Sequence, residues 1–278
     1  MSKFDTFEAY PDGSIDLANR ALLTAWDSLA AFHDDLVLVG GLAIRHLTKP
    51  PADGLPGPVT LDVDFGIHIG VESGMYMSVR EHLQSHGFAW TGKRFQREVD
   101  RLPVYIDLLT EVPGRQSGSV VVEDGLWVGV IPGVQRALDC YRTLAITGEN
   151  MIGAAVTQHI KVAEVGPMLV LKLNAFGGPT GRKASKDAHD ILYLALEYLD
   201  GPEAAIAAFA AERAAGNHAA EQAIACLRND FATPDAQGPL ACAAFRLNNR
   251  HRDPALRTES DQIRQLCVTL AHALIAGK

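Results

Sequence analysis

The sequence lacks the features that direct a protein to or across a membrane. No apolar run reaches the length of a membrane-spanning helix, and the opening residues MSKFDTFEAYPDG do not form a signal peptide. Cysteine is scarce, and the four cysteines form no C-x-x-C pair and no metal-ligand spacing: they are Cys140, Cys226, Cys242 and Cys267. We therefore expect a cytoplasmic protein with reduced, mostly buried thiols and no membrane partner.

Two common catalytic motifs are also missing. The absence of G-x-S-x-G removes the hydrolase nucleophile elbow, and the absence of G-x-G-x-x-G removes the dinucleotide-binding turn. A net charge of −8 argues against a protein that coats nucleic acid nonspecifically, since that affinity comes from neutralising phosphates. A local basic patch that binds one particular RNA remains compatible with this charge.

The composition is that of a globular protein with one large domain or two modest ones. The 278 residues are 47% hydrophobic and 21% charged. Strands alternate with helices as far as Val165, but after Pro167 alanine rises and β-branched residues become fewer. We predict an α/β (α+β) fold with a mixed β-sheet in a core of residues 1–166, followed by a helical C-terminal domain of residues 167–278.

A glycine pair follows the first predicted strand. Leu36 to Val39 form a short apolar run that is typical of a buried strand, and Gly40 and Gly41 separate it from a helix of residues 42–47. Glycines let the backbone approach a ligand closely, and free N–H groups at the start of a helix favour an anion. The pair therefore predicts a phosphate-binding turn.

Two aspartates lie on the next predicted strand, which spans residues 59–67. Because strand side chains alternate, Asp62 and Asp64 lie on one face while Leu61, Val63 and Phe65 lie on the other. Paired carboxylates repel each other unless a hard cation such as Mg²⁺ binds them. The alternative is that Asp62 merely ends the strand and Asp64 is solvated.

Hydrophobic periodicity predicts the remaining elements. Strands are expected at 88–90, 94–99, 104–109, 119–122 and 126–131, and helices at 15–33, 134–144, 168–176, 186–199, 202–215, 218–229, 238–248 and 259–276.

The order of four motifs resembles a known superfamily. The glycine turn and Asp-x-Asp strand precede VYIDLL (104–109), which carries Asp107, and then LVLKLNAF (169–176) and RKASKDAHDILYL (182–194). Over residues 36–200 this order is similar to the DNA polymerase β-like nucleotidyltransferases, and the last two motifs resemble the AbiEii-type nucleotidyltransferase toxins. The sequence departs from that pattern at Leu42, where many members have serine, and in the longer segment 49–58.

The resemblance implies a catalytic and a nucleotide-binding set. Two Mg²⁺ ions, or Mn²⁺ in their place, would be held by Asp62, Asp64 and Asp107, with Asp107 accepting the proton of the attacking hydroxyl. Nucleotide binding is expected from Gly40, Gly41, Lys172, Arg182, Lys186, Asp187 and Asp190. For Asp107 the alternative is an edge-strand carboxylate that faces water.

Lys172 lies in a predicted helix that is apolar almost all round. A buried ammonium needs a negative partner, which would be the triphosphate or an aspartate, unless the side chain reaches the surface instead. Arg182, Lys183 and Lys186 form the basic cluster expected to face phosphate. Lys186 and Asp190 are also spaced to pair with each other, which is the structural alternative.

The expected reaction transfers a nucleotide from an NTP to an acceptor and releases pyrophosphate. The resemblance implies RNA, such as tRNA, as the acceptor, a role as the toxin of a type IV-like toxin–antitoxin system, and an antitoxin protein as partner. Two alternatives remain open: a non-catalytic member that binds a nucleotide or a partner, and a nucleotidyltransferase that acts on a small molecule, as antibiotic-modifying relatives do.

Overall fold

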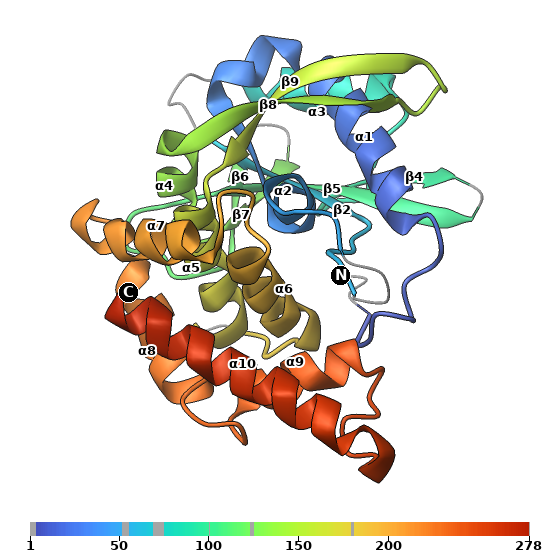
Figure 1. Cartoon of the computed structure of the whole chain (residues 1–278). Helices are drawn as coiled ribbons and strands as arrows, with labels where there is room; N and C mark the ends of the chain where they lie inside the picture. Colours follow the sequence, from blue (N-terminus) through green and yellow to red (C-terminus); the bar gives the residue numbers. More distant parts are fainter. Residues whose placement is uncertain are drawn as a thin grey trace. The chain divides into compact units, whose positions relative to one another are not determined.

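The computed structural model describes residues 4–51, 56–68, 75–99, 101–122, 125–178 and 181–277. The chain divides into two compact units (Figure 1). The sheet unit comprises residues 12–43 and 59–164, and the helical unit comprises residues 1–11, 44–58 and 165–278. The sequence placed a boundary at residues 166 and 167, but composition gave no sign that segments 1–11 and 44–58 belong with the C-terminal helices.

The sheet unit is built on a mixed sheet. Its strand order is β3 (Ala89–Trp90), β4 (Phe95–Val99), β5 (Leu102–Thr110), β2 (Asp62–Ile67), β1 (Leu36–Val39), β9 (Ala155–Ala163) and β8 (Tyr141–Glu149). A further pair, β6 (Ser119–Val122) and β7 (Leu126–Val130), joins through β7 to β5. The pairs β2–β5, β1–β9 and β5–β7 are parallel and the others are antiparallel, so the predicted mixed sheet is confirmed.

Helices α1 (Ser14–Ser28) and α4 (Val134–Asp139) cover opposite faces of this sheet. Trp26 of α1 lies 6.0 Å from the ring of Phe65, whereas a Cβ on the next residue, Gly66, would meet Val134 of α4 at 3.2 Å. Because side chains alternate along a strand, Asp62, Asp64 and Gly66 share the face opposite Phe65. The predicted separation of the two aspartates from the apolar face of β2 is therefore confirmed.

Two predicted helices were too long, and a strand ribbon was missed. The helix expected over residues 134–144 ends at Asp139, and β8 begins at Tyr141 and pairs with β9 along nine residues each. The β8 segment alternates between more and less exposed positions and contains Thr143, Ile146 and Thr147, which suit a strand. Similarly, the helix expected over 15–33 ends at Ser28 and gives way to the 3₁₀ helix η1 (Ala30–Asp35).

The helical unit packs its helices around one apolar core. Its members are α5 (Val165–Gly177), α6 (Ser185–Leu196), α7 (Pro202–Ala214), α8 (Ala220–Asp230), α9 (Gln237–Arg246), the 3₁₀ helix η3 (Pro254–Leu256) and α10 (Arg257–Ala276). Helix α5 contacts α6, α7 and α8, and α9 packs between α6 and α10. Phe176, Phe209 and Phe245 are fully buried there. The predicted C-terminal helical region is confirmed.

Two N-terminal segments complete the helical unit. The Phe7 N–H donates to the Phe245 carbonyl at 3.3 Å. Thr48, which follows α2 (Gly40–Leu47), bridges to Tyr198, and the Lys49 N–H donates to the Glu197 carbonyl at 2.8 Å. These backbone hydrogen bonds explain why the segments group with distant helices.

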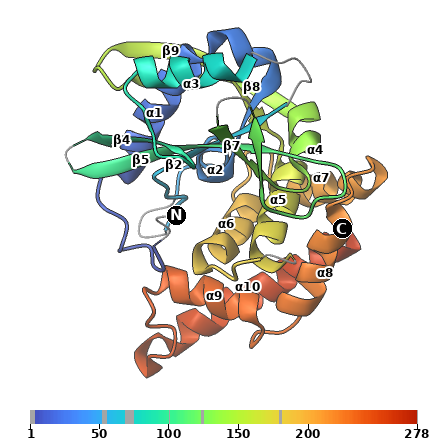
Figure 2. The ribbon, with the colours of Figure 1, turned by 180° about the vertical axis from the view of Figure 1, so that it is seen from behind.

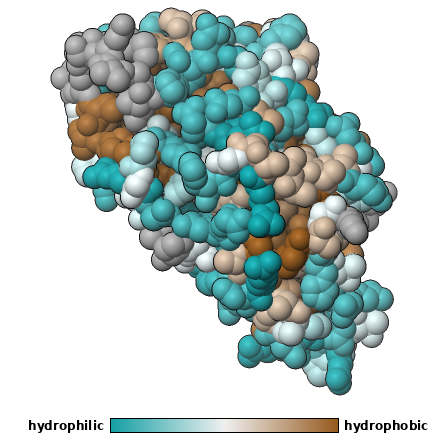
Figure 3. Space-filling view, turned by 90° about the vertical axis from the view of Figure 1, so that its left-hand side faces the viewer, coloured by the Kyte–Doolittle hydropathy of each residue, from teal (hydrophilic) through white to brown (hydrophobic). Residues whose placement is uncertain are grey.

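One face of the molecule is mostly polar. Hydrophilic side chains cover most of the face shown in Figure 3, with smaller hydrophobic patches. The exposed large hydrophobic side chains of the described residues are Val121, Trp127, Tyr141, Ile152, Leu199 and Leu266. None of the helices in the described ranges has both the length and the apolar character that a membrane crossing requires.

Candidate active site

The turn between β1 and α2 depends on two glycines that make room for neighbouring side chains. Gly40 has a φ of +74°, and a Cβ at this position would collide with the Asp64 carboxylate. A Cβ at Gly41 would lie 2.9 Å from the Thr60 Cβ. The predicted glycine turn is present, although α2 already begins at Gly40, and it brings the backbone directly against Asp64.

Three carboxylates lie on two adjacent parallel strands. Asp64 of β2 is in register with Asp107 of β5, and Asp62 is in register with Tyr105. Figure 2 shows β2 and β5 side by side, with β4 on the far side of β5. Asp107 therefore does not lie on an edge strand, and that alternative is wrong. Asp62 is buried although it is the first residue of β2, and Asp64 is only partly exposed.

Arg94, immediately before β4, links carboxylates of both strands. Its Nε donates to Asp107 Oδ1 at 2.9 Å, and its Nη2 donates to Asp62 Oδ1 at 2.9 Å and also to Asp107 Oδ2. The guanidinium lies over the ring of Tyr105, 4.1 Å from the ring centre. Planar guanidinium geometry favours such bidentate bonds and such stacking, so Arg94 is firmly placed.

The cluster remains rich in negative charge. Burial alone would lower the pKa of Arg94, but Asp107, Asp62 and Asp64 outweigh it and raise that pKa. For Asp107, burial raises the pKa, Arg94 opposes the rise, and Asp62 adds to it, so that the pKa ends above its ordinary value. A carboxylate with a raised pKa is a stronger base than an ordinary aspartate, which suits a proton acceptor.

The donor chemistry of this cluster suits a divalent cation. Hard cations prefer carboxylate oxygens, and the guanidinium of Arg94 already places positive charge between Asp62 and Asp107. In the ranges that the structure describes, no three His, Cys, Asp or Glu side chains lie close enough together to hold a metal ion. In this arrangement the guanidinium of Arg94 is the cation paired with Asp62 and Asp107.

A second charge cluster lies in the helical unit between α5 and α6. Lys172 Nζ donates to Asp190 Oδ2 at 2.6 Å and to Asp187 Oδ1 at 3.4 Å. Lys186 Nζ also donates to Asp190 Oδ2 at 2.6 Å. Lys172 is 7% exposed and the two aspartates are fully buried, so the lysine does not reach the surface. Its negative partners are aspartates, one of the two kinds of partner expected.

The ion pairs of this second cluster set the protonation of Asp190. Burial would raise the pKa of this carboxyl, but Lys172 and Lys186 outweigh burial and lower the pKa to about 2. The carboxylate is therefore ionised at neutral pH. The pairing of Lys186 with Asp190, which was the structural alternative, is present, and the nucleotide-binding role of Lys172, Lys186, Asp187 and Asp190 stays a prediction.

The predicted basic cluster on the 182–186 segment is largely engaged by carboxylates. Arg182 Nη2 donates to Asp187 Oδ2 at 3.1 Å, and Lys183 Nζ pairs with Asp230. Both basic side chains keep about a third of their surface exposed, at 35% and 39%. Arg182 and Lys183 are therefore paired with carboxylates and do not form a free patch of positive charge.

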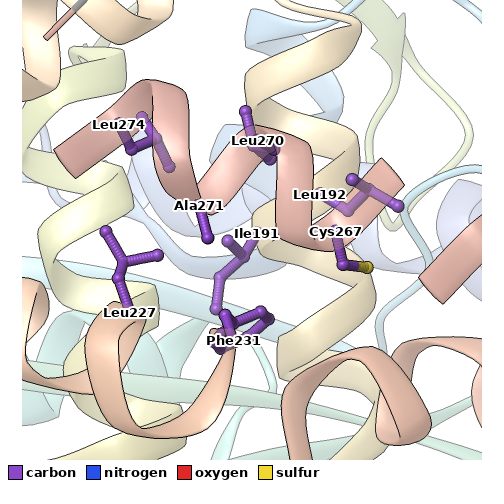
Figure 4. Close-up of a pocket in the computed structure, with 8 residues that line it drawn as sticks. All are labelled: Ile191, Leu192, Leu227, Phe231, Cys267, Leu270, Ala271 and Leu274. Atoms are coloured by element: carbon purple, nitrogen blue, oxygen red, sulfur yellow. The ribbon is translucent and has the colours of Figure 1, made fainter. Parts of the chain in front are cut away.

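An apolar pocket between α6, α8 and α10 offers no anchor for a polar ligand. Figure 4 shows the side chains that line it, and their only heteroatom is the Cys267 sulfur: Ile191, Leu192, Leu227, Phe231, Cys267, Leu270, Ala271 and Leu274. A ligand site needs a few placed polar groups to orient its occupant. This pocket is therefore packing space in the core of the helical unit.

Sequence reasoning missed Arg94, although a signal for it exists. The antiparallel β4–β5 pair is closed by a short connection, with Val99 opposite Leu102 and Phe95 opposite Ile106. Continuing this register by one residue places Arg94 opposite Asp107. Opposite charges at facing positions of an antiparallel pair attract each other, so the hairpin register would have predicted the ion pair.

Comparison with known proteins adds little to this geometry. No protein-family model matches the sequence, and no curated protein matches it significantly. Among solved structures, the chain is similar to the CD-NTase CdnG of Bradyrhizobium diazoefficiens, solved in complex with GTP, at 13% identity and a TM-score of 0.28. The match covers 96% of this chain and 91% of that chain. A likeness this weak does not establish a common fold.

Proposed function

We propose that the protein is a Mg²⁺-dependent nucleotidyltransferase that uses the carboxylates of the sheet unit. The observation that carries the proposal is the placement of Asp62, Asp64 and Asp107 on adjacent parallel strands, next to the glycine turn at Gly40. All three carboxylates raise the pKa of Arg94, so each lies close enough to act on the same cation, and carboxylate oxygens are the ligands that Mg²⁺ prefers.

The residues of the sheet unit have distinct roles in this proposal. Asp62, Asp64 and Asp107 would hold the metal ions, and the backbone at Gly40 and Gly41 would receive the phosphates. Bound divalent ions would neutralise the negative charge of the phosphates and of the developing transition state. Leu42, buried behind the turn, supplies no hydroxyl there, so backbone N–H groups are the donors that the turn offers.

Asp107 is the proposed proton acceptor. The acceptor hydroxyl oxygen bonds to the α-phosphorus of the NTP, the bond from that phosphorus to the pyrophosphate oxygen breaks, and the hydroxyl proton passes to Asp107. Its raised pKa makes this transfer easier than it would be for an ordinary aspartate. Arg94 holds Asp107 and Asp62 in position through its hydrogen bonds to both carboxylates.

The proposed acceptor is RNA, such as tRNA, and the proposed setting is a type IV-like toxin–antitoxin pair with an antitoxin protein as partner. The support for both is the resemblance of the LVLKLNAF and RKASKDAHDILYL segments to AbiEii-type toxins. A small-molecule acceptor is the enzymatic alternative. We also propose that Lys172, Arg182, Lys186, Asp187 and Asp190 support nucleotide binding, as that resemblance implies.

A specific observation favours a second candidate function. Arg94 already satisfies Asp62 and Asp107 with three hydrogen bonds. A non-catalytic protein that binds a nucleotide or a partner through this unit would keep that ion pair permanently. The two candidates differ in whether metal displaces Arg94 and whether nucleotide is transferred.

One assay separates these candidates. The protein is incubated with each α-labelled NTP, Mg²⁺ and total RNA, and a parallel reaction replaces RNA with small hydroxylated acceptors. We expect labelled RNA from the wild type and none from the variant Asp62→Asn/Asp64→Asn. The exposed Asp16→Asn serves as the matched control and should retain activity. Label that persists in the folded double variant contradicts the assignment, and label on small molecules alone moves the acceptor to that class.

A further inference from the structure

A second pocket in the helical unit lies where η3 meets the start of α10. Its volume is about 370 Å³, which falls in the range of small-molecule sites. Leu240 and Pro254 supply apolar surface, and His251, Arg252, Arg257 and Ser260 are among the polar residues that line it. Unlike the apolar pocket of Figure 4, this pocket presents several hydrogen-bonding groups.

Three polar atoms at this pocket are buried and have no hydrogen-bond partner among the described residues: Ser260 Oγ, Arg264 Nε and His251 Nδ1. Ser260 is 1% exposed, and its hydroxyl lies in the first turn of α10. A buried polar atom without a partner is costly, so a group from outside the chain is needed to satisfy these three.

The identity of the three atoms restricts the ligand. Arg264 Nε can only donate, a serine hydroxyl can donate, and one imidazole nitrogen of neutral histidine donates. Burial, with Arg252 and Arg264 nearby, lowers the pKa of His251, so its imidazole is neutral at pH 7. Arg264 Nε requires an acceptor, and acceptor oxygens can satisfy all three atoms when Ser260 and His251 donate to them.

The charges at the pocket favour an anion. Arg252 forms no ion pair with any residue of the described ranges, and Arg257 meets Asp261 only at 4.0 Å. Both acidic residues of the lining are already engaged: Asp261 pairs with Arg264, and Asp253 Oδ1 accepts from the Ala255 N–H at 2.9 Å. The remaining positive charge belongs to Arg252 and Arg257.

We propose that this pocket is a binding site for a phosphate-bearing ligand of nucleotide size. The phosphate oxygens accept from Ser260, Arg264 and His251 while Arg252 and Arg257 balance its charge. Leu240 and Pro254 provide an apolar wall for the organic part. Two sources share this chemistry, a free mononucleotide and one nucleotide unit of an RNA strand. The site belongs to the helical unit alone and does not depend on the proposed transferase activity.

Calorimetric titrations in EDTA test this site, because metal-dependent binding by the sheet carboxylates is then silent. The probes are inorganic phosphate, AMP and a short single-stranded oligoribonucleotide. The variants are Ser260→Ala and Arg252→Gln, and Arg228→Gln is the matched control, an exposed arginine of α8 outside the pocket. Ser260→Ala loses no hydrogen bond within the described part of the chain, so its melting temperature should match that of the wild type.

We expect the wild type to bind AMP more tightly than phosphate. The affinity for AMP should be at least tenfold lower in Arg252→Gln and severalfold lower in Ser260→Ala. In Arg228→Gln it should be unchanged. If the oligoribonucleotide shows the same variant pattern, an RNA strand is the source; if AMP alone does, a free nucleotide is. Absence of wild-type binding to every probe overturns the proposal and leaves bound water as the partner of the three atoms. Equal losses in Arg252→Gln and Arg228→Gln overturn it too, since binding would then be nonspecific.

Discussion

The two charge clusters of this protein contain the same residue types but differ in the burial and the pairing of their carboxylates. In the sheet unit, the Arg94 guanidinium is shared by Asp62 and Asp107, its pKa is raised by both and by Asp64, and the Asp107 side chain keeps a quarter of its surface exposed. In the helical unit, the carboxylates of Asp187 and Asp190 are fully buried and are matched by several basic side chains.

This difference separates a candidate metal site from a cluster whose carboxylates are already paired. Buried carboxylates that are paired with basic side chains have little left to offer a cation, and breaking such a pair leaves an uncompensated buried charge. A partly exposed cluster with excess negative charge gains from binding a cation. The pKa values agree with this contrast, since that of Asp190 is lowered to about 2 while that of Asp107 is raised.

The largest expected effect on stability is that of Asp190→Asn. The change leaves Lys172 and Lys186 buried without their shared carboxylate, so the free energy of unfolding should fall by about 3–5 kcal/mol. Urea denaturation at pH 7 measures it. Asp34→Asn, which removes an exposed partner of Lys161, should cause no measurable change.

A double variant makes this prediction sharper. Asp190→Asn combined with Lys186→Met removes one of the two ammonium groups that Asp190→Asn leaves without their shared carboxylate. The double variant should therefore recover part of the lost stability. If Asp190→Asn alone unfolds no more easily than the Asp34→Asn control, the cluster is not the network that the structure indicates.

The proposed role of Lys172 in nucleotide binding needs a separate test. NTP is titrated into a Lys172→Met variant that remains folded, and its affinity is compared with that of the wild type.

The next effect concerns Arg94→Met. Without metal, three carboxylates then repel one another, and unfolding should become easier by about 1.5–3 kcal/mol, the range for hydrogen bonds to charged groups. With millimolar Mg²⁺ the variant should recover more stability than the wild type gains. Thermal melts with and without Mg²⁺ measure both.

Arg97→Met is the matched control, because Arg97 lies three residues after Arg94, on β4, and donates to the His86 carbonyl instead of to a carboxylate. Its response to Mg²⁺ should equal that of the wild type. An equal response in Arg94→Met would show that Arg94 does not compete with metal.

The contributions of Asp190 and Asp107 to the free energy of unfolding should change with pH in opposite directions. In the folded protein the pKa of Asp190 is lowered. Its contribution to stability is therefore present above about pH 4 and is lost as the pH falls toward 2. The shift in pKa corresponds to about 2 kcal/mol of stability. The folded pKa of Asp107 is raised, so its contribution is present below its ordinary pKa of 3.8 and is lost as the pH rises through the folded value. Urea denaturation from pH 2 to 7 follows both.

Asp107→Asn isolates the second of these effects. Relative to the wild type, this variant should gain stability as the pH rises from 4 to 7, because it no longer carries a partly buried carboxylate next to Asp62. A difference that does not change with pH would contradict the raised pKa of Asp107.

A smaller effect is expected at the glycine turn. Gly40 and Gly13 both have positive φ, but a Cβ at Gly13 meets nothing within 4 Å, whereas one at Gly40 meets Asp64. Gly13→Ala should therefore lose only the backbone term of about 1–2 kcal/mol. Gly40→Ala should lose more and should also weaken metal binding. Equal losses and unchanged metal affinity would mean that the turn does not position Asp64.

Local patterns in the sequence were sufficient to predict the centre of the sheet. The apolar run Leu36–Val39, the glycine pair and the alternation around Asp62 and Asp64 each carry their signal within a few residues. The ribbon of β8 and β9 was missed because its alternation is weak and follows directly on a helix that ends at Asp139.

Partners far apart in the chain were harder to predict. Lys172 was recognised as needing a negative partner, but its choice of Asp190 depends on how α5 packs on α6. The attachment of residues 44–58 to the helical unit rests on backbone hydrogen bonds, such as that of Leu199 N–H to the Leu47 carbonyl, which composition does not report.

The most direct test of the central claim is metal binding by the sheet carboxylates. Three proteins are titrated with Mn²⁺: the wild type, Asp62→Asn/Asp64→Asn and the exposed control Asp16→Asn. The electron paramagnetic resonance signal of free Mn²⁺ is measured at each step. We predict that wild type and Asp16→Asn deplete free Mn²⁺ equally and that the double variant, still folded by circular dichroism, does not. Equal depletion by all three proteins, or none by the wild type, would contradict the account.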